Sequence, residues 1–523
     1  EQLEQVFHLA ESSGETSDFR QAIEESYAAQ PDNLLYGAWA ARLRYAAAYT
    51  QTHARQWAIN WAWAVPLALL NGLLFWWLSN ERYMVEIVGF QGRRDDFVPL
   101  LILLAAPMAS VFVLAYLAAA GKRKWSVAAL CALLALAAAG YVLLFYPQLG
   151  TMPFQQQYVG LMIAHLPLVA WAAVGFYLTA GHRDAANRFA FLISSLQVFV
   201  VGGLFAIAGA IFMGITIALF EALGIQMPEP VLLLFLAGGL GVLSVLVVAV
   251  VYNPSVSPAE QPFDEGLGRL ISLLPRILLP LTLLVLVIYL VFVAFNFRAP
   301  FDNRDVLITY NAMLFAVVAL LVGATPLNKT AVTYRQAPWL RRGIIAVAAL
   351  ALLVGIYALV AIAFRSYYDR LTPNRLTFIG WNVVNIALLA FLLWRQARAA
   401  QGSWIEELHR AFGAGTVAYT AWALAVILVM PWLFGFDQGA VGQLPLTVQR
   451  IIYNVPDPVL LKCTASDPIY LLEDGEKRWI ESIETFEESG YRWSDVQFVS
   501  CDDLRTVPDG VPIPPGAGPP PQP

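Results

Sequence analysis

Long apolar runs are the feature that most limits what this 523-residue chain can fold into. A helix needs about 20 mainly apolar residues to cross the roughly 30 Å hydrocarbon core of a bilayer. The runs do not alternate between apolar and polar residues as barrel strands do, so they predict helices. We count eleven and expect membrane-spanning helices near residues 57–79, 99–120, 125–146, 158–181, 189–222, 231–253, 276–296, 308–327, 343–364, 376–395 and 414–436.

The composition agrees with an all-α polytopic membrane protein. Hydrophobic residues make up 59% of the chain and charged residues 13%, whereas soluble domains hold about 45–50% and about 25%. The 16 tryptophans and 21 tyrosines fit this class, because both residue types gather at membrane interfaces. The net charge of −5 is small and arises at the ends, which excludes nucleic acid as an expected partner and leaves the lipid bilayer.

Changes in composition along the chain divide it into five parts. The first and last parts are polar, and the middle carries all the long apolar runs. We expect the Pro-rich tail to be extended or disordered. The parts are a cytoplasmic helical segment (1–56), a transmembrane helical bundle (57–436), a polar connection (437–456), a small extracytoplasmic α+β domain (457–510) and the tail (511–523).

The distribution of basic residues predicts the orientation. Connections near 147–157 and 224–230 contain no Lys or Arg, and with eleven crossings both lie on one side. The positive-inside rule then puts the N-terminus in the cytoplasm and the C-terminus outside. The misfits are Arg365, Arg370 and Arg375. The basic residues on the other side are Lys122, Arg123, Lys124, Lys329, Arg335, Arg341, Arg342, Arg395, Arg398 and Arg410.

The first 56 residues are predicted to form helices with a turn at 31–33 and Trp39 on the last helix. This arrangement resembles a degenerate tetratricopeptide unit over about 40 residues. A single repeat cannot bury its own apolar face, so we expect the segment to dock on the cytoplasmic loops or on a protein partner.

Two cysteines bracket the C-terminal domain. Strands are predicted over 459–461 and 469–472, followed by a turn at Asp474-Gly475 and a helix that stops at Gly490. Cys463 and Cys501 read as a disulfide in an oxidising compartment, and two unpaired buried thiols are the alternative.

The aromatic residues of this domain carry a resemblance. The sequence from Tyr470 to Ile480, followed by Phe486 and Gly490-Tyr491-Arg492-Trp493, resembles a short module of exported bacterial surface proteins. The resemblance implies an extracellular setting beside other extracellular domains and no assigned activity. Trp479, Tyr491 and Trp493 form either a platform for a sugar or peptide or the core of the small domain.

A second resemblance covers residues 190–435. The Arg370-Leu371-Thr372-Pro373-Asn374-Arg375 element before the tenth run resembles a motif of an uncharacterised bacterial family of multi-spanning proteins, known as a domain of unknown function. It implies a polytopic helical fold without assigned chemistry.

Small and polar residues within the runs are the candidates for packing or for a cavity. The run 189–222 is long enough for one tilted span or two short ones, and it carries a stripe of small residues that favours close helix packing. Asn382 and Asn385 lie on one helical face beside Trp381, where they line a cavity or bond between helices. His165 is expected to be hydrogen-bonded within the bundle. The stripe consists of Gly202, Ala206, Ala210 and Gly214.

Three functions fit these features, and no catalytic, cofactor-binding or metal-binding residue is predicted. The first is a non-catalytic envelope scaffold or accessory subunit with protein partners on both membrane faces. The second is a transporter or channel for a neutral or lipidic solute, because ionisable residues are scarce within the runs. The third is a polyprenyl-phosphate-dependent glycosyltransferase using acidic residues of the first external loop, namely Glu81, Glu86, Asp95 and Asp96.

Overall fold

The computed structural model divides the chain into two compact units, residues 1–61 and 62–523. Each unit is described by itself. The residues that the structure describes are 3–4, 6–7, 10, 16–44, 59–86, 97–145, 152–182, 184–263, 266–298, 301, 304–327, 336–368, 371–434, 441, 444–455, 458–473 and 475–521.

The N-terminal unit has a hydrophobic core of its own. Helix α2 (Thr16–Ala29) packs against a helix over residues 34–44. The rings of Phe7, Phe19 and Trp39 meet in pairs at 5.6 Å between centroids, and Ile23 lies buried beside them. The expectation that this segment cannot bury its own apolar face was therefore wrong, because Phe7 from the preceding residues closes the core.

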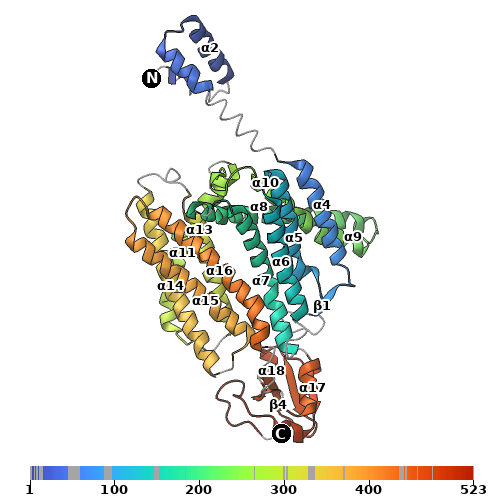
Figure 1. Ribbon diagram of the computed structural model, residues 1–523. Coiled ribbons are helices and arrows are strands. Elements are labelled where there is room, and N and C mark those ends of the chain that lie inside the picture. The colour runs from blue at the N-terminus through green and yellow to red at the C-terminus, as the bar shows by residue number, and fades with distance from the viewer. Residues whose placement is uncertain are drawn as a thin grey trace. The chain divides into compact units, whose positions relative to one another are not determined.

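The second unit contains a bundle of long helices (Figure 1). Among the described residues, ten helices are long and apolar enough to cross a membrane, and they coincide with ten of the eleven predicted runs. The remaining predicted run, 308–327, falls on α13, which holds a shorter apolar stretch over Thr309–Ala324. The helices are α4 (Trp61–Leu78), α5 (Leu101–Gly121), α6 (Trp125–Phe145), α7 (Met152–Thr179), α8 (Ala185–Ala222), α9 (Glu229–Leu233), the π-helical η2 (Leu234–Gly238), α10 (Gly239–Val251), α11 (Gly266–Phe295), α13 (Arg304–Ala324), α14 (Ala337–Tyr368), α15 (Pro373–Arg398) and α16 (Trp404–Phe434).

The run 189–222 forms one continuous helix and is not broken into two. Helix α8 has 38 residues, or about 57 Å at 1.5 Å per residue, well beyond the thickness of hydrocarbon. Asp184 caps its start by accepting a hydrogen bond from the backbone N–H of Asn187. Beyond Val201, its side chains are half-buried or exposed on every face.

Packing in the bundle follows two groups of neighbouring helices. Helices α5, α6 and α7 contact one another, and α14, α15 and α16 form the other group, with α11 and α13 against α14 (Figure 1). Helix α16 joins the groups because it also contacts α7 and α8. The largest core cluster includes Phe189, Leu314, Val347 and Leu408.

The C-terminal domain is a four-stranded sheet with helices on both faces, as the α+β prediction requires. The strand order is β5-β4-β3-β6, antiparallel except for the parallel pair β3–β6. Gly490, with φ +75°, follows the end of α18 in a backbone conformation that glycine adopts without strain. The elements are β3 (Val459–Cys463), β4 (Ile469–Glu473), β5 (Glu476–Ile480), α18 (Ile483–Glu488), the 3-10 turn η6 (Trp493–Asp495), β6 (Val496–Val499) and α19 (Cys501–Thr506).

Two predicted boundaries of this domain were wrong. The supposed connection 437–456 contains helix α17 (Leu446–Asn454), whose Val448 and Ile452 are buried in the same core cluster as Val459. One helical turn separates these two residues, so both face the sheet. The domain therefore includes residues from Val441 onward.

The tail is hydrogen-bonded to the sheet and is therefore part of the domain. The segment after α19 runs beside β5, where the backbone N–H of Ile513 donates to the carbonyl oxygen of Trp479 (2.7 Å) and that of Glu481 donates to Ile513 (3.0 Å). The Tyr470 hydroxyl donates to the carbonyl oxygen of Pro521 (2.6 Å). The tail is extended as predicted, but it covers an edge of the sheet.

Candidate functional site

A buried layer of neutral polar side chains lies where α7, α13, α15 and α16 meet. It contains His165, Asn311, Asn382 and Asn385, none more than 3% exposed. Helix α15 contacts the other three helices and presents both asparagines to them. Polar groups that are this deeply buried need hydrogen-bond partners, so their bonds decide what the layer does.

His165 is fixed by two hydrogen bonds. Its Nδ1 lies 2.7 Å from the carbonyl oxygen of Leu161, and its Nε2 accepts a hydrogen bond from the Trp381 indole at 3.0 Å. Both ring nitrogens are thereby used by a neutral imidazole. The prediction that His165 is bonded within the bundle is confirmed. Among the described residues no cluster of three or more His, Cys, Asp or Glu side chains suits a metal ion.

The two asparagines each bond across a helix interface. Asn382 donates from Nδ2 to Asn311 Oδ1 at 2.7 Å, and Asn385 Oδ1 accepts from the Tyr419 hydroxyl. The rings of Trp381, Tyr419 and Phe315 pack around them, with centroids 5.2–5.9 Å apart. Asn382 Oδ1 and Asn385 Nδ2 are buried without a partner among the described atoms. The interhelical bonds predicted as one alternative are present.

We expect the Asn311–Asn382 bond to couple α13 to α15. In a double-mutant cycle of N311L and N382L, the coupling free energy should be about 0.6 kcal/mol and at most about 1.7 kcal/mol, the range for polar pairs in membrane bundles. Unfolding of the full chain in mixed micelles measures it. The control pairs N311L with N71L on α4, where the two effects should add. A cycle with no coupling would show that the bond does not hold the helices together.

The predicted small-residue stripe of α8 is only partly packed. Gly202 and Ala206 are half-buried, and a Cβ on Gly202 would meet Val247 of α10 at 3.8 Å. Ala210 and Gly214 are exposed, and a Cβ on Gly214 would meet no atom within 4 Å. The first half of the stripe is thus a helix contact.

Asn71 is a neutral polar residue of the first apolar run that was not among the predicted packing residues. It lies fully buried in α4 and donates from Nδ2 to the carbonyl oxygen of Gly241 (2.8 Å) and to the Ser244 hydroxyl (2.9 Å) of α10. An isolated asparagine in an apolar run was the available signal, because such a side chain has to find a partner.

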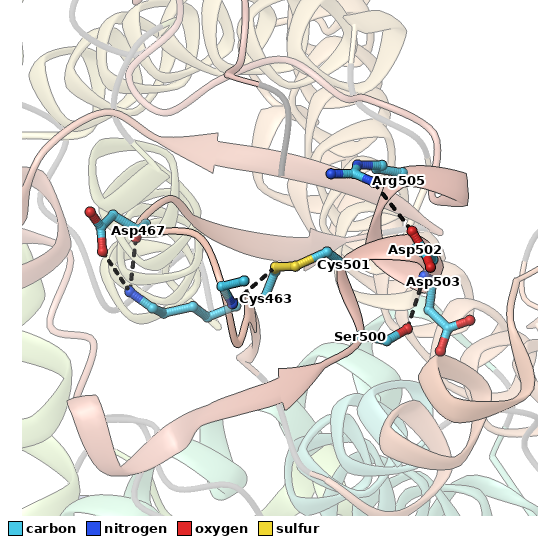
Figure 2. The surroundings of a disulfide bond; sticks show 9 residues. Cys463, Asp467, Ser500, Cys501, Asp502, Asp503 and Arg505 are labelled. Atoms are coloured by element: carbon cyan, nitrogen blue, oxygen red, sulfur yellow. Dashed lines mark hydrogen bonds and ion pairs between the residues drawn. A yellow bond between two sulfur atoms is a disulfide. The ribbon is translucent and has the colours of Figure 1, made fainter.

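The predicted disulfide is present in the C-terminal domain (Figure 2). Cys463 ends β3 and Cys501 begins α19, with the two Cα atoms 4.8 Å apart and 38 positions apart in sequence. Ser500 caps α19 by accepting a hydrogen bond from the backbone N–H of Asp503 (3.1 Å). The bond therefore ties the central strand to the last helix of the domain.

The three aromatic residues proposed as a platform do not share a surface. Trp479 packs with Tyr470 and the cluster on one face of the sheet. Tyr491 packs against the cluster on the other face. The ring centroid of Trp493 lies 5.0 Å from that of Phe486, which belongs to the same cluster. Trp479 and Tyr491 are thus half-buried and pack against two different core clusters, while Trp493 is 53% exposed.

An open groove of about 560 Å³ lies on the surface of this domain, between α17 and the edge strand β6. Phe498, Arg450 and Asp503 line it, and Phe498 is 62% exposed. The core cluster on this side of the sheet contains Tyr470. Burial in it raises the pKa of Tyr470 to about 12, with the negative charge of Asp509 adding to the effect.

The connection between α4 and α5 lies only partly within the described residues. Residues Met84–Glu86 (β1) and Phe97–Pro99 (β2) pair as an antiparallel ribbon that was not predicted. Asp95 and Asp96, the candidate bases of a glycosyltransferase, lie outside the described residues, as do Lys329, Arg335 and Arg370.

Arg123 and His409 bond to backbone carbonyl oxygens at one end of the bundle, which we call the basic end. Its five connections are residues 122–124, 180–182, 252–263, 325–327 and 399–403. Arg123 donates to the carbonyl oxygens of Val256 (2.7 Å) and Leu178 (3.3 Å). His409 Nε2 lies 2.9 Å from the carbonyl oxygen of Pro326. The His409 ring stacks on that of Phe189, with 4.2 Å between the ring centroids.

Comparison of the chain with models of protein families, with curated proteins and with solved structures gave no match.

Proposed function

We propose that this chain is a non-catalytic integral membrane protein, a scaffold or accessory subunit of an assembly in a bacterial cytoplasmic membrane. The observation that carries the proposal is how the polar side chains inside the bundle are used. His165, Asn71, Asn382 and Asn385 all bond to a neighbouring helix or to their own backbone. Such bonds make a rigid body that holds a folded domain at its C-terminal end.

Eleven crossings, with α13 as the eighth, carry the chain from the cytoplasm to the outside. The proposal is supported by the basic end, since its five connections are those that an odd number of crossings assigns to the N-terminal side. Exposed tryptophans near helix ends support it as well, because indoles favour the headgroup region. They are Trp61, Trp63, Trp76, Trp77, Trp125, Trp339, Trp394 and Trp432.

The scaffold role predicts partners that depend on the C-terminal domain. We expect removal of residues 441–523 to abolish the recovery of associated proteins after cross-linking in native membranes and purification of the tagged chain. Within the intact domain, F498S at the groove should lower recovery several-fold. I483S is the matched control, because Ile483 is a comparably exposed apolar residue, 58% exposed, outside the groove. Unchanged recovery after removal of the domain would refute the role.

A second candidate is a transporter for a neutral solute. It is favoured by Asn382 Oδ1 and Asn385 Nδ2, a buried acceptor and a buried donor one helical turn apart without partners among the described atoms. Each such atom disfavours folding by about 1–3 kcal/mol when unsatisfied. In vesicles containing the purified chain, uptake of a neutral solute that N382L abolishes would replace the scaffold with this candidate.

A further inference from the structure

Four arginines lie on α14 and α15 at the basic end, and two of them bond to other residues of the bundle. Arg341 donates to the carbonyl oxygens of Gln396 (2.7 Å) and Ala399 (3.0 Å). Arg395 forms an ion pair with Glu407 of α16. These bonds tie the start of α14 to the end of α15, so the remaining two arginines lie at the same end of the bundle.

The other two, Arg342 and Arg398, lie over tryptophan rings. The Arg398 guanidinium carbon is 4.6 Å from the ring centroid of Trp394, and that of Arg342 is 5.6 Å from the ring centroid of Trp339. Both arginines are exposed, and neither forms an ion pair with any described residue. The indoles are 45% and 73% exposed. A stacked guanidinium uses its face and leaves its N–H edges for an acceptor.

The residues at this end of α14, α15 and α16 carry a net positive charge, which favours the binding of an anion. Residues 337–342 and 395–410 hold five arginines and two glutamates, a net charge of +3 with His neutral. Glu407 lies close to both Arg395 and Arg410. Arg341 uses its donors on neutral oxygens of Gln396 and Ala399. The exposed positive charge without an ion pair among the described residues therefore lies on Arg342 and Arg398, at the ends of apolar helices where exposed indoles mark the headgroup level.

We propose that Arg398 with Trp394, and Arg342 with Trp339, bind the phosphate groups of anionic phospholipids. The guanidinium edge donates two parallel hydrogen bonds to phosphate oxygens, a geometry that arginine matches and lysine does not. The indole lies along the upper acyl chain and holds the guanidinium plane in place. The inference rests on the proposed membrane-spanning role of the bundle.

The test uses the purified full chain in neutral detergent micelles. Phosphatidylglycerol is titrated against phosphatidylcholine with identical acyl chains, and lipid adducts are counted by native mass spectrometry. We expect preferential binding of phosphatidylglycerol. R342Q/R398Q should weaken it about 30-fold, from about 1 kcal/mol for each arginine. R342K/R398K should recover only part of the loss.

The matched control is R82Q, because Arg82 is an exposed arginine in the connection after α4 and forms no ion pair among the described residues. It should bind like the parent chain. Equal binding of the two lipids, an equal loss in R82Q, or unchanged binding in R342Q/R398Q would overturn the proposal. Displacement by millimolar inorganic phosphate would assign the pairs to a free anion instead. A chain that stays dispersed without detergent would refute the membrane role, a separate failure.

Discussion

Replacing Gly380 by alanine should destabilise the bundle by about 1–3 kcal/mol or more, as overpacking does in a closely packed interior. Gly380 lies in α15, and a Cβ at this position would overlap the indole ring of Trp422 on α16. The three atoms nearest to this Cβ all belong to the Trp422 ring, so the ring has to shift or push the two helices apart. Unfolding of the full chain in mixed micelles measures the loss.

The matched control is G209A in α8, where an added Cβ meets no described atom within 4 Å. It should be neutral or stabilise by up to about 1 kcal/mol, because alanine favours helix over glycine. In a W422A background, G380A should have little further effect, since the clash is gone. Equal effects of G380A and G209A would show that α15 and α16 do not pack this closely.

Removing the disulfide should have an effect of similar size on the C-terminal domain. For a closed loop of 38 positions, the chain-entropy model gives a loss of about 3–4 kcal/mol in C463A/C501A. The domain should then be cleaved by protease at denaturant concentrations that leave the parent chain intact. C131A is the control, because Cys131 is a free buried thiol in α6. If C463A/C501A resisted protease as well as the parent chain does, the sheet and its helices would stabilise the domain without the disulfide.

The helices were predictable because each apolar run is long enough to be read without knowing its neighbours. The run predicted over 308–327 overlaps α13 (Arg304–Ala324) for the same reason. The strands around Cys463 were predictable for a local reason too, namely short apolar segments separated by a Gly turn.

Long-range partners were not predictable. Val448 and Ile452 face a sheet that follows them in sequence. From the sequence alone, the segment that forms α17 therefore resembled a polar connection. Asn311 was not singled out, because its role depends on Asn382, 71 positions further on. The aromatic platform failed because strand alternation sends Trp479 to one face of the sheet, while Tyr491 comes from outside the strands. The resemblance of residues 190–435 to an uncharacterised family stays a prediction.

The proposed orientation is tested most directly by labelling single introduced cysteines in intact cells with a membrane-impermeant maleimide. In a C131A background the chain would carry A28C in α2, K124C at the basic end, or E488C at the end of α18, all at exposed positions. We expect E488C to react in intact cells, and A28C and K124C only after the membrane is opened. If E488C and K124C became reactive together, the two ends of the bundle would not face opposite sides, and the account of an odd number of crossings would be wrong.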